Sequence, residues 1–242
     1  INTVISVIFQ DKMADESEKE KCPDMIDTVW ISGSLIIMRV MYHNNIRSPK
    51  KTGRFLGKKL CEIHNEVRLD AAINLVRQEF YVGCDNHVLL AAAKVGIIPA
   101  KPVATGVGSG ALNQSLLTEM TYMEIGSLKM LLLPGEPFPE NIYGGYLSAD
   151  ESADGQSPDI NPPPLCKETG LDLIVIGLAN DEIGYIPPPN DFHLHPDMPY
   201  VKAHPDRFKR RHYEETNSLG PQTASRIYEV FHQIMWQVHW DK

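Results

Sequence analysis

An acid and a phenol follow two apolar segments of the sequence, each near the point where the segment ends. Glu136 comes shortly after residues 128–133, and Tyr185 lies in the loop after residues 173–178. Both segments read as buried strands, and in α/β proteins the loops after the carboxyl ends of strands collect ligand-binding side chains. We therefore expect Glu136 and Tyr185 to approach each other at one edge of a sheet. Further polar side chains follow at Asn180, Asp181, Glu182, Tyr213, Glu214 and Glu215.

Each of these side chains also has an interpretation without catalysis. A carboxylate at Glu136 could stabilise the backbone amides at the start of a helix. Tyr185 could anchor the turn that follows residue 180, and Tyr213 could be a buried phenol whose hydroxyl is satisfied by hydrogen bonds. The residue types and their positions leave both interpretations open.

Three segments carry a resemblance to a known family. They are LLLPGEPFPE at residues 131–140, GLANDEIGYIPP at 177–188 and HYEETNSLGPQTA at 212–224. In this order they resemble the C-terminal half of the catalytic domain in the neutral/alkaline non-lysosomal ceramidase family. Members have a Pro-Gly-Glu after a strand, a Gly-x-x-Asn-x-x-x-x-Tyr turn and a Tyr-Glu segment followed by Gly-Pro-x-Thr. With VRQEFYV at 76–82 and GIIPAKP at 96–102, the resemblance covers roughly residues 50–240 and fits the shorter ceramidase-like type.

The resemblance implies a zinc-dependent amide hydrolase that acts on a lipid-like or other N-acyl amide substrate, as in the cleavage of ceramide to a free amine and a fatty acid. In family enzymes the residues that match Glu136 and Tyr185 bind a catalytic zinc together with two histidines. The residue that matches Tyr213 lies by the scissile amide, where its hydroxyl can stabilise the oxyanion that develops on the carbonyl. The family nucleophile is a serine in a glycine-rich turn, and the segment WISGSL at residues 30–35 makes Ser34 the candidate.

The two family histidines lie well upstream of Pro-Gly-Glu, in a part of the fold that this chain is expected to lack. Because two ligands alone hold zinc poorly, we expect this chain alone to bind zinc weakly. His193, His195, His204 and His212 either replace the missing ligands, since His-x-His can chelate a metal, or belong to an exposed proline-rich loop. The alternative function is a non-catalytic ceramidase-like fragment or subunit with a binding or structural role.

Alternating strand and helix patterns predict an α/β fold, with helices packed on a mixed β-sheet. We expect a single ceramidase-like domain over residues 1–242, truncated at its N-terminus because the chain begins at Ile1 without a methionine. Residues 137–169, rich in Pro, Gly, Ser and Asp, are typical of a surface excursion. Strands are expected at 1–10, 73–82 and 173–178, a strand–turn–strand at 28–41, and a β-hairpin at 117–133 around Gly126.

Helix signals occur at three places. Residues 52–66 have apolar positions at helical spacing with lysines on the other face. Asn86 can cap a short helix at 88–95 that stops at Gly96. The last helix is expected from Pro221 to about residue 238, because proline suits the first turn of a helix. Its apolar stripe consists of Ala224, Ile227, Phe231, Ile234 and Val238.

Composition narrows the class of protein. Hydrophobic residues make up 43% of the 242 residues and charged residues 22%, as in folded globular proteins. No apolar run is long enough for a transmembrane segment. The net charge of -8 disfavours nucleic acid as a partner, because phosphate contact rewards positive charge. The 4 cysteines have no Cys-x-x-Cys spacing, which favours buried thiols over a zinc knuckle or a disulfide framework.

Overall fold

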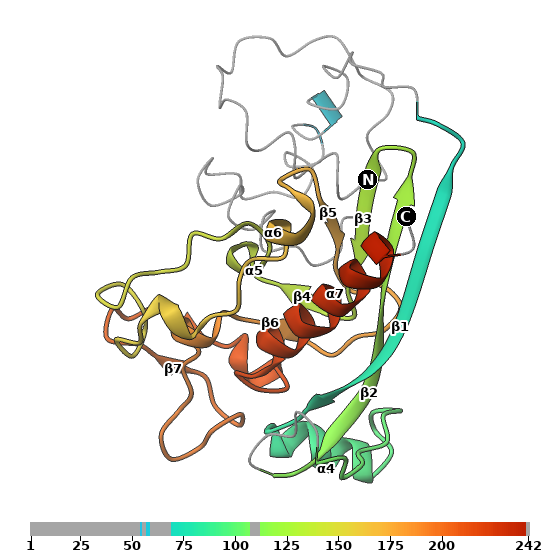
Figure 1. Cartoon of the computed structure of the whole chain (residues 1–242). Helices are drawn as coiled ribbons and strands as arrows, with labels where there is room; N and C mark the ends of the chain where they lie inside the picture. Colours follow the sequence, from blue (N-terminus) through green and yellow to red (C-terminus); the bar gives the residue numbers. More distant parts are fainter. Residues whose placement is uncertain (1–53, 55–56, 59–68, 107–111, 241–242) are drawn as a thin grey trace. The chain divides into compact units, whose positions relative to one another are not determined.

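The computed structural model describes residues 54, 57–58, 69–106 and 112–240 (Figure 1). The chain divides into two compact units, residues 1–70 and 71–242, and the second contains nearly all of the described residues. Ser34 and the strands expected at 1–10 and within 28–41 lie outside the described residues. Of the helix expected at 52–66, only residues 54, 57 and 58 are described, and they are helical.

The second unit is built on a four-stranded sheet with the order β1-β2-β3-β5. β1 (Ile73–Gly83), β2 (Ser115–Ile125) and β3 (Leu128–Leu132) pair antiparallel, whereas β5 (Ile174–Ile176) pairs with β3 in parallel. The predicted hairpin is confirmed, and β2 and β3 join at a turn in which Gly126 has a φ of 56°. β5 is shorter than predicted, because the chain leaves the sheet after Ile176.

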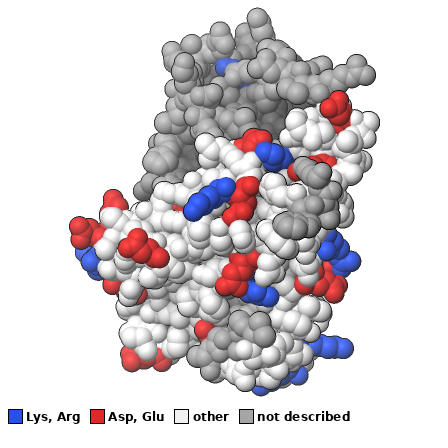
Figure 2. Space-filling model, viewed as in Figure 1, with Lys and Arg blue, Asp and Glu red and all other residues white. Residues whose placement is uncertain are grey.

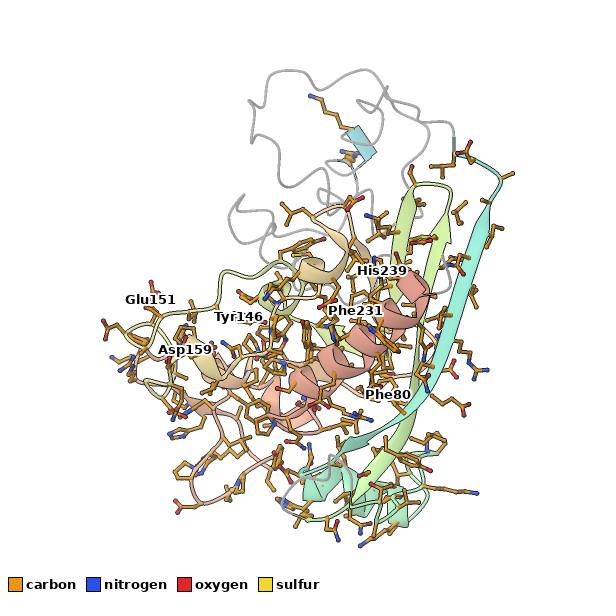
Figure 3. The ribbon with its side chains drawn as sticks, in the orientation of Figure 1. Phe80, Tyr146, Glu151, Asp159, Phe231 and His239 are labelled. Carbon is orange, nitrogen blue, oxygen red and sulfur yellow. The ribbon has the colours of Figure 1, made fainter. Side chains whose placement is uncertain are left out.

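Helix α7 (Thr223–Trp240) packs on this sheet and contacts β1 (Figure 1). The predicted apolar stripe is confirmed, since each of its five residues is at most 4% exposed. The same core contains Phe80 of β1, and the ring of Tyr122 on β2 lies 5.9 Å from the ring of Phe231 (Figure 3). α7 begins at Thr223 rather than at Pro221, because residues 221–222 form a turn that Thr223 closes with a hydrogen bond to the carbonyl of Gly220.

Helix α4 (His87–Lys94) confirms the predicted short helix and its cap. The Oδ1 atom of Asn86 accepts hydrogen bonds from the amides of Val88 and Leu89, both at 3.1 Å. Its Nδ2 atom donates to the carbonyls of Thr216 and Ser218 at 3.0 and 2.9 Å. The fully buried Asn86 therefore joins the end of β1 to a segment far along the chain.

Residues 137–169 lie largely at the surface, as predicted, but parts of the segment are packed against the rest of the unit. The side-chain amide of Asn141 donates to the carbonyl of Ile186 at 2.8 Å, and the hydroxyl of Tyr146 donates to the carbonyl of Pro162 at 2.9 Å (Figure 3). The segment forms α5 (Pro139–Tyr143), η1 (Pro158–Ile160) and α6 (Cys166–Thr169), and it buries Asn141, Ile142, Ser152, Ala153, Leu165 and Cys166.

Two short strand pairs and two turns complete the unit. The mixed sheet with helices packed on it confirms the predicted α/β class. The elements are β4 (Glu136–Pro137) paired in parallel with β6 (Tyr185–Ile186), β7 (His204–Pro205) paired antiparallel with β8 (Arg211–His212), η2 (Pro189–Asp191) and η3 (Glu215–Asn217).

The described surface carries charges of both signs. On the face shown in Figure 2, Lys and Arg side chains are interspersed with Asp and Glu. In the part of the chain that the structure describes, no helix is long and apolar enough to cross a membrane. Cys84 and Cys166 are free and buried, as predicted for the cysteines.

Candidate functional site

Glu136 and Tyr185 lie side by side although they are far apart in the sequence. β3 and β5 run parallel as neighbours in the sheet, so the segments that follow them leave at the same edge. These segments pair again as β4 and β6, in which Glu136 and Tyr185 are register partners. Both side chains are partly buried. In the structure, Glu136 and Tyr185 therefore lie close together, as the sequence predicts.

Glycines allow the backbones to come this close. A Cβ atom on Gly135 would lie 2.5 Å from the carbonyl oxygen of Gly184, which accepts a hydrogen bond from the amide of Glu136 at 2.9 Å. Gly184 has a φ of 86°, and a Cβ atom there would overlap the carbonyl oxygen of Asn217. The glycines before Glu136 and before Tyr185 are thus required by the contact between β4, β6 and η3.

Two hydroxyl groups of β2 hold the loop between β5 and β6. Thr118 donates to Asp181 Oδ2 at 2.8 Å, and Thr121 accepts from Asn180 Nδ2 at 2.9 Å. Asn180 has a φ of 73°, a conformation that asparagine tolerates better than most residues. Sequence reasoning identified the polar loop but missed both threonines, because alternation along a strand predicts which face they occupy and not what they bind.

Tyr213 joins the pair from a third segment. Its ring lies 5.9 Å from the ring of Tyr185, with 84° between the ring planes. The side chain is 38% exposed, so the alternative of a buried phenol is wrong. The structure therefore brings together Glu136, Tyr185 and Tyr213, three of the four predicted site residues, and the fourth, Ser34, lies outside the described residues.

The site is rich in acids. Burial raises the pKa of Glu136, and the negative charge of Glu182 raises it further. Burial also raises the pKa of Tyr185, with further contributions from its hydrogen bond with Tyr213 and from the charges of Glu136 and Glu214. Burial raises the pKa of Glu214 as well. Burial and the nearby negative charges make it costly for these acids and phenols to ionise. A bound cation would reduce that cost.

The predicted histidine group also comes together. The ring of His193 lies 5.2 Å from the rings of both His204 and His212, and the ring of His195 lies 4.8 Å from that of His204. His212 is buried and the other three are partly buried, so the histidines are more enclosed than an exposed loop would make them. Sequence reasoning named Glu215 but did not connect it with the histidines, and it missed Asp206 and Asp154, the last of which lies 39 positions from its partner His193.

A buried network fixes His212, the residue before Tyr213. His212 Nδ1 lies 2.6 Å from Glu215 Oε1, and its Nε2 lies 3.4 Å from Asp206 Oδ2. Burial alone would lower the pKa of His212, but the hydrogen bonds to Glu215 and Asp206 raise it above its usual value. Arg210 Nε donates to Asp206 Oδ2 at 2.6 Å, which joins the two ends of the turn between β7 and β8. Tyr213 therefore follows a fixed segment.

Within the described ranges, no three His, Cys, Asp or Glu side chains already surround one point as metal ligands would. Glu136 and Tyr185 supply two oxygen donors, and the two further histidines implied by the ceramidase resemblance are not identified among the described residues. No protein-family model, no curated protein and no solved structure matches the chain.

Proposed function

We propose that this chain carries part of the active site of a zinc-dependent amide hydrolase that resembles neutral ceramidase and cleaves an N-acyl, ceramide-like bond. The observation that carries the proposal is the pairing of Glu136 with Tyr185 in β4 and β6, with the ring of Tyr213 against that of Tyr185. The three segments that contribute these residues are the three that resemble the ceramidase family, and they are separated by long stretches of chain.

The donor chemistry of the pair fits zinc. Carboxylate oxygen is a regular zinc ligand, and a phenol oxygen is a donor of the same hard kind. The two residues lie on register partners, so their side chains start from neighbouring backbone positions. Glu182 and Glu214 add negative charge near them, which favours a cation at this edge. When bound, zinc would polarise the amide carbonyl and activate the attacking group.

The chain's own residues then have distinct roles. Glu136 and Tyr185 hold the metal and orient it toward the exposed side of the edge. Tyr213, whose ring is partly exposed, donates a hydrogen bond to the carbonyl oxygen as negative charge develops there. The glycines at 135 and 184 keep the backbones close enough for one substrate group to reach all three side chains. Ser34 remains the candidate nucleophile: its hydroxyl would form an ester with the acyl group, the departing amine would take up the proton, and water would then hydrolyse the ester to the free fatty acid.

Zinc affinity separates this role of Glu136 from a structural one. The chain with His193→Gln serves as the background, because the histidine group could bind zinc on its own. Glu136→Gln removes a ligand charge and should weaken zinc binding by at least about 10-fold to 100-fold, measured by competition with a chromogenic chelator. Tyr213→Phe should leave the affinity within about twofold of the background, since Tyr213 is a hydrogen-bond donor and not a ligand.

A matched control and an activity measurement complete the test. Glu79→Gln removes an exposed acid of β1 and should change nothing. In a longer form that hydrolyses a fluorescent ceramide, Tyr213→Phe should cost roughly 10²-fold to 10³-fold in rate, and Glu136→Gln should cost more. Equal zinc affinity and equal residual rates in the two variants would show that Glu136 is a structural carboxylate. The non-catalytic, ceramidase-like role would then be the better description.

A further inference from the structure

The histidine group at the β7–β8 hairpin has chemistry that the proposed hydrolase does not use, although His212 directly precedes Tyr213 in the chain. His193 and His195 precede the hairpin, His204 lies on β7 and His212 on β8. β7 and β8 pair so that His204 and His212 are register partners, and the ring of His193 contacts both of their rings.

In two of these rings a carboxylate contacts the Nδ1 atom and leaves the Nε2 atom for another partner. His193 Nδ1 lies 2.8 Å from Asp154 Oδ1, and His212 Nδ1 lies 2.6 Å from Glu215 Oε1. The Nε2 atom of His193 is buried without a hydrogen-bond partner, and the buried Nε2 atom of His212 has only a long contact of 3.4 Å with Asp206 Oδ2. Buried polar atoms without partners are rare in folded proteins. A histidine whose second ring nitrogen is fixed by a carboxylate is the usual arrangement of a metal-binding histidine.

The distances between the rings also suit a shared ion. With metal–nitrogen bonds of about 2.1 Å, two imidazoles on one tetrahedral ion have ring centres roughly 5 Å apart. The ring centres of His193 and His212 are 5.2 Å apart at 66° between planes, and those of His193 and His204 are also 5.2 Å apart at 29°. The first pair is inclined and the second is stacked.

The surroundings carry negative charge. Asp154, Asp206 and Glu215 lie within hydrogen-bond or ion-pair distance of the histidines, and Arg210 is bound to Asp206. Asp206 Oδ2 lies 3.4 Å from His212 Nε2, which places a carboxylate oxygen beside this nitrogen. Three carboxylates outnumber the two nearby cations, the guanidinium of Arg210 and the ammonium of Lys202, which favours a further cation at this place.

We propose that His193, His204 and His212 form a binding site for a divalent transition-metal ion of the zinc type, separate from Glu136 and Tyr185. Imidazole nitrogen is a preferred donor for Zn²⁺, Co²⁺ and Ni²⁺. No three ligands already surround one point in the described part of the chain, so the stacked ring of His204 turns toward the ion on binding. His204 is only partly buried and lies on a two-residue strand, which leaves room for that rotation.

The probe is Co²⁺, because a histidine-bound tetrahedral Co²⁺ ion has a visible absorption that a merely associated ion lacks. The full chain is used without a histidine tag and with Tyr185→Phe, so that the proposed zinc site does not contribute. This protein should bind one equivalent of Co²⁺, and Zn²⁺ should displace it. His193→Gln and His204→Gln should each weaken binding by at least about 10-fold, as expected for the loss of a ligand.

Two further variants keep the test decisive if a ligand variant folds poorly. Asp154→Asn changes a carboxylate that is 47% exposed and should weaken binding by about 10-fold to 100-fold through His193, with an unchanged circular dichroism spectrum. His232→Gln removes a histidine of α7 that is 58% exposed and should have no effect. The absence of a visible Co²⁺ spectrum, or equal affinity in all variants, would overturn the proposal and leave buried water as the partner of the two nitrogens. Neither result would affect the roles of Glu136 and Tyr185.

Discussion

At the residue scale, Gly135 and Gly184 decide whether Glu136 and Tyr185 can stand side by side. Each glycine directly precedes one of these side chains, and each faces a backbone carbonyl across the contact. Gly184 also has a positive φ, which an L side chain adopts only at a cost. Small residues at these positions are therefore part of the site, even though they have no functional group.

Gly184→Ala should destabilise the protein by about 2–5 kcal/mol, as the sum of the cost of a positive φ and the overlap with Asn217. Gly145→Ala is the matched control, because Gly145 has nearly the same φ, 84°, with nothing within 4 Å of an added Cβ atom. It should cost only about 1–2 kcal/mol. Urea unfolding monitored by circular dichroism measures both. Similar losses in the two variants would show that the contact with Asn217 relaxes easily.

The sequence was sufficient to identify Glu136, Tyr185 and Tyr213 as one group, because motif and strand position agree. It could not identify the residues that hold them. Thr118 and Thr121 bind loop residues about 60 positions away, and Asp154 reaches His193 across 39 positions. Such contacts depend on how segments pack, and no local periodicity encodes them.

At the element scale, the β7–β8 hairpin depends on one buried carboxylate. Asp206 is 6% exposed and accepts hydrogen bonds from the amides of Phe208 and Arg210, both at 2.8 Å, and from the Arg210 guanidinium. Burial alone would raise the pKa of Asp206, but these hydrogen bonds and the one from His212 outweigh it and lower the pKa to about 2. The ionised carboxylate therefore stabilises the hairpin.

The sign of the pH dependence follows from this shift. Since the pKa of Asp206 falls from 3.8 in the unfolded chain to about 2 on folding, its stabilisation is complete above about pH 4 and disappears as the pH falls through 2. Its size is about 2 kcal/mol. Asp206→Asn should therefore be less stable than the parent protein by about this amount at pH 7 and equally stable near pH 2.

Urea unfolding between pH 2 and pH 7, with EDTA present, tests this expectation. Asp150→Asn is the control, because Asp150 is exposed and its replacement should leave the acid dependence unchanged. A constant difference between Asp206→Asn and the parent protein over the whole range would mean that the carboxylate contributes through its shape and not through its charge.

The elements themselves were mostly predictable, and their ends were not. Apolar alternation and the helical stripe located β1, β2, β3 and α7, and Asn86 marked the start of α4. The end of β5 and the start of α7 differ from expectation because a positive φ at Leu178 and a turn closed by Thr223 decide them. In residues 137–169 the turn-forming composition concealed a packed layer, since the side chains of Asn141 and Asn190 bind backbone carbonyls there.

At the scale of the whole molecule, the α/β class followed from the sequence, but the strand order did not. The parallel pairing of β3 with β5 determines the site, because it brings the ends of two distant strands to one edge. Sequence patterns predict that both strands exist, whereas their adjacency is a long-range contact that no local pattern encodes. The predicted acid–phenol pair and the histidine group are thus carried on one compact unit.

The chain tested alone should bind zinc weakly at Glu136 and Tyr185. It should hydrolyse little or no ceramide. Two oxygen ligands leave a zinc ion under-coordinated, since zinc sites in proteins use three or four protein ligands. The resemblance to ceramidases assigns the other two ligands to histidines upstream of these motifs. Elemental analysis after dialysis, in the His193→Gln background, should find far less than one zinc per chain, and a fluorescent ceramide should stay uncleaved. Stoichiometric zinc that is lost with Glu136→Gln, together with hydrolysis that depends on Tyr213, would instead show that this chain contains a complete site.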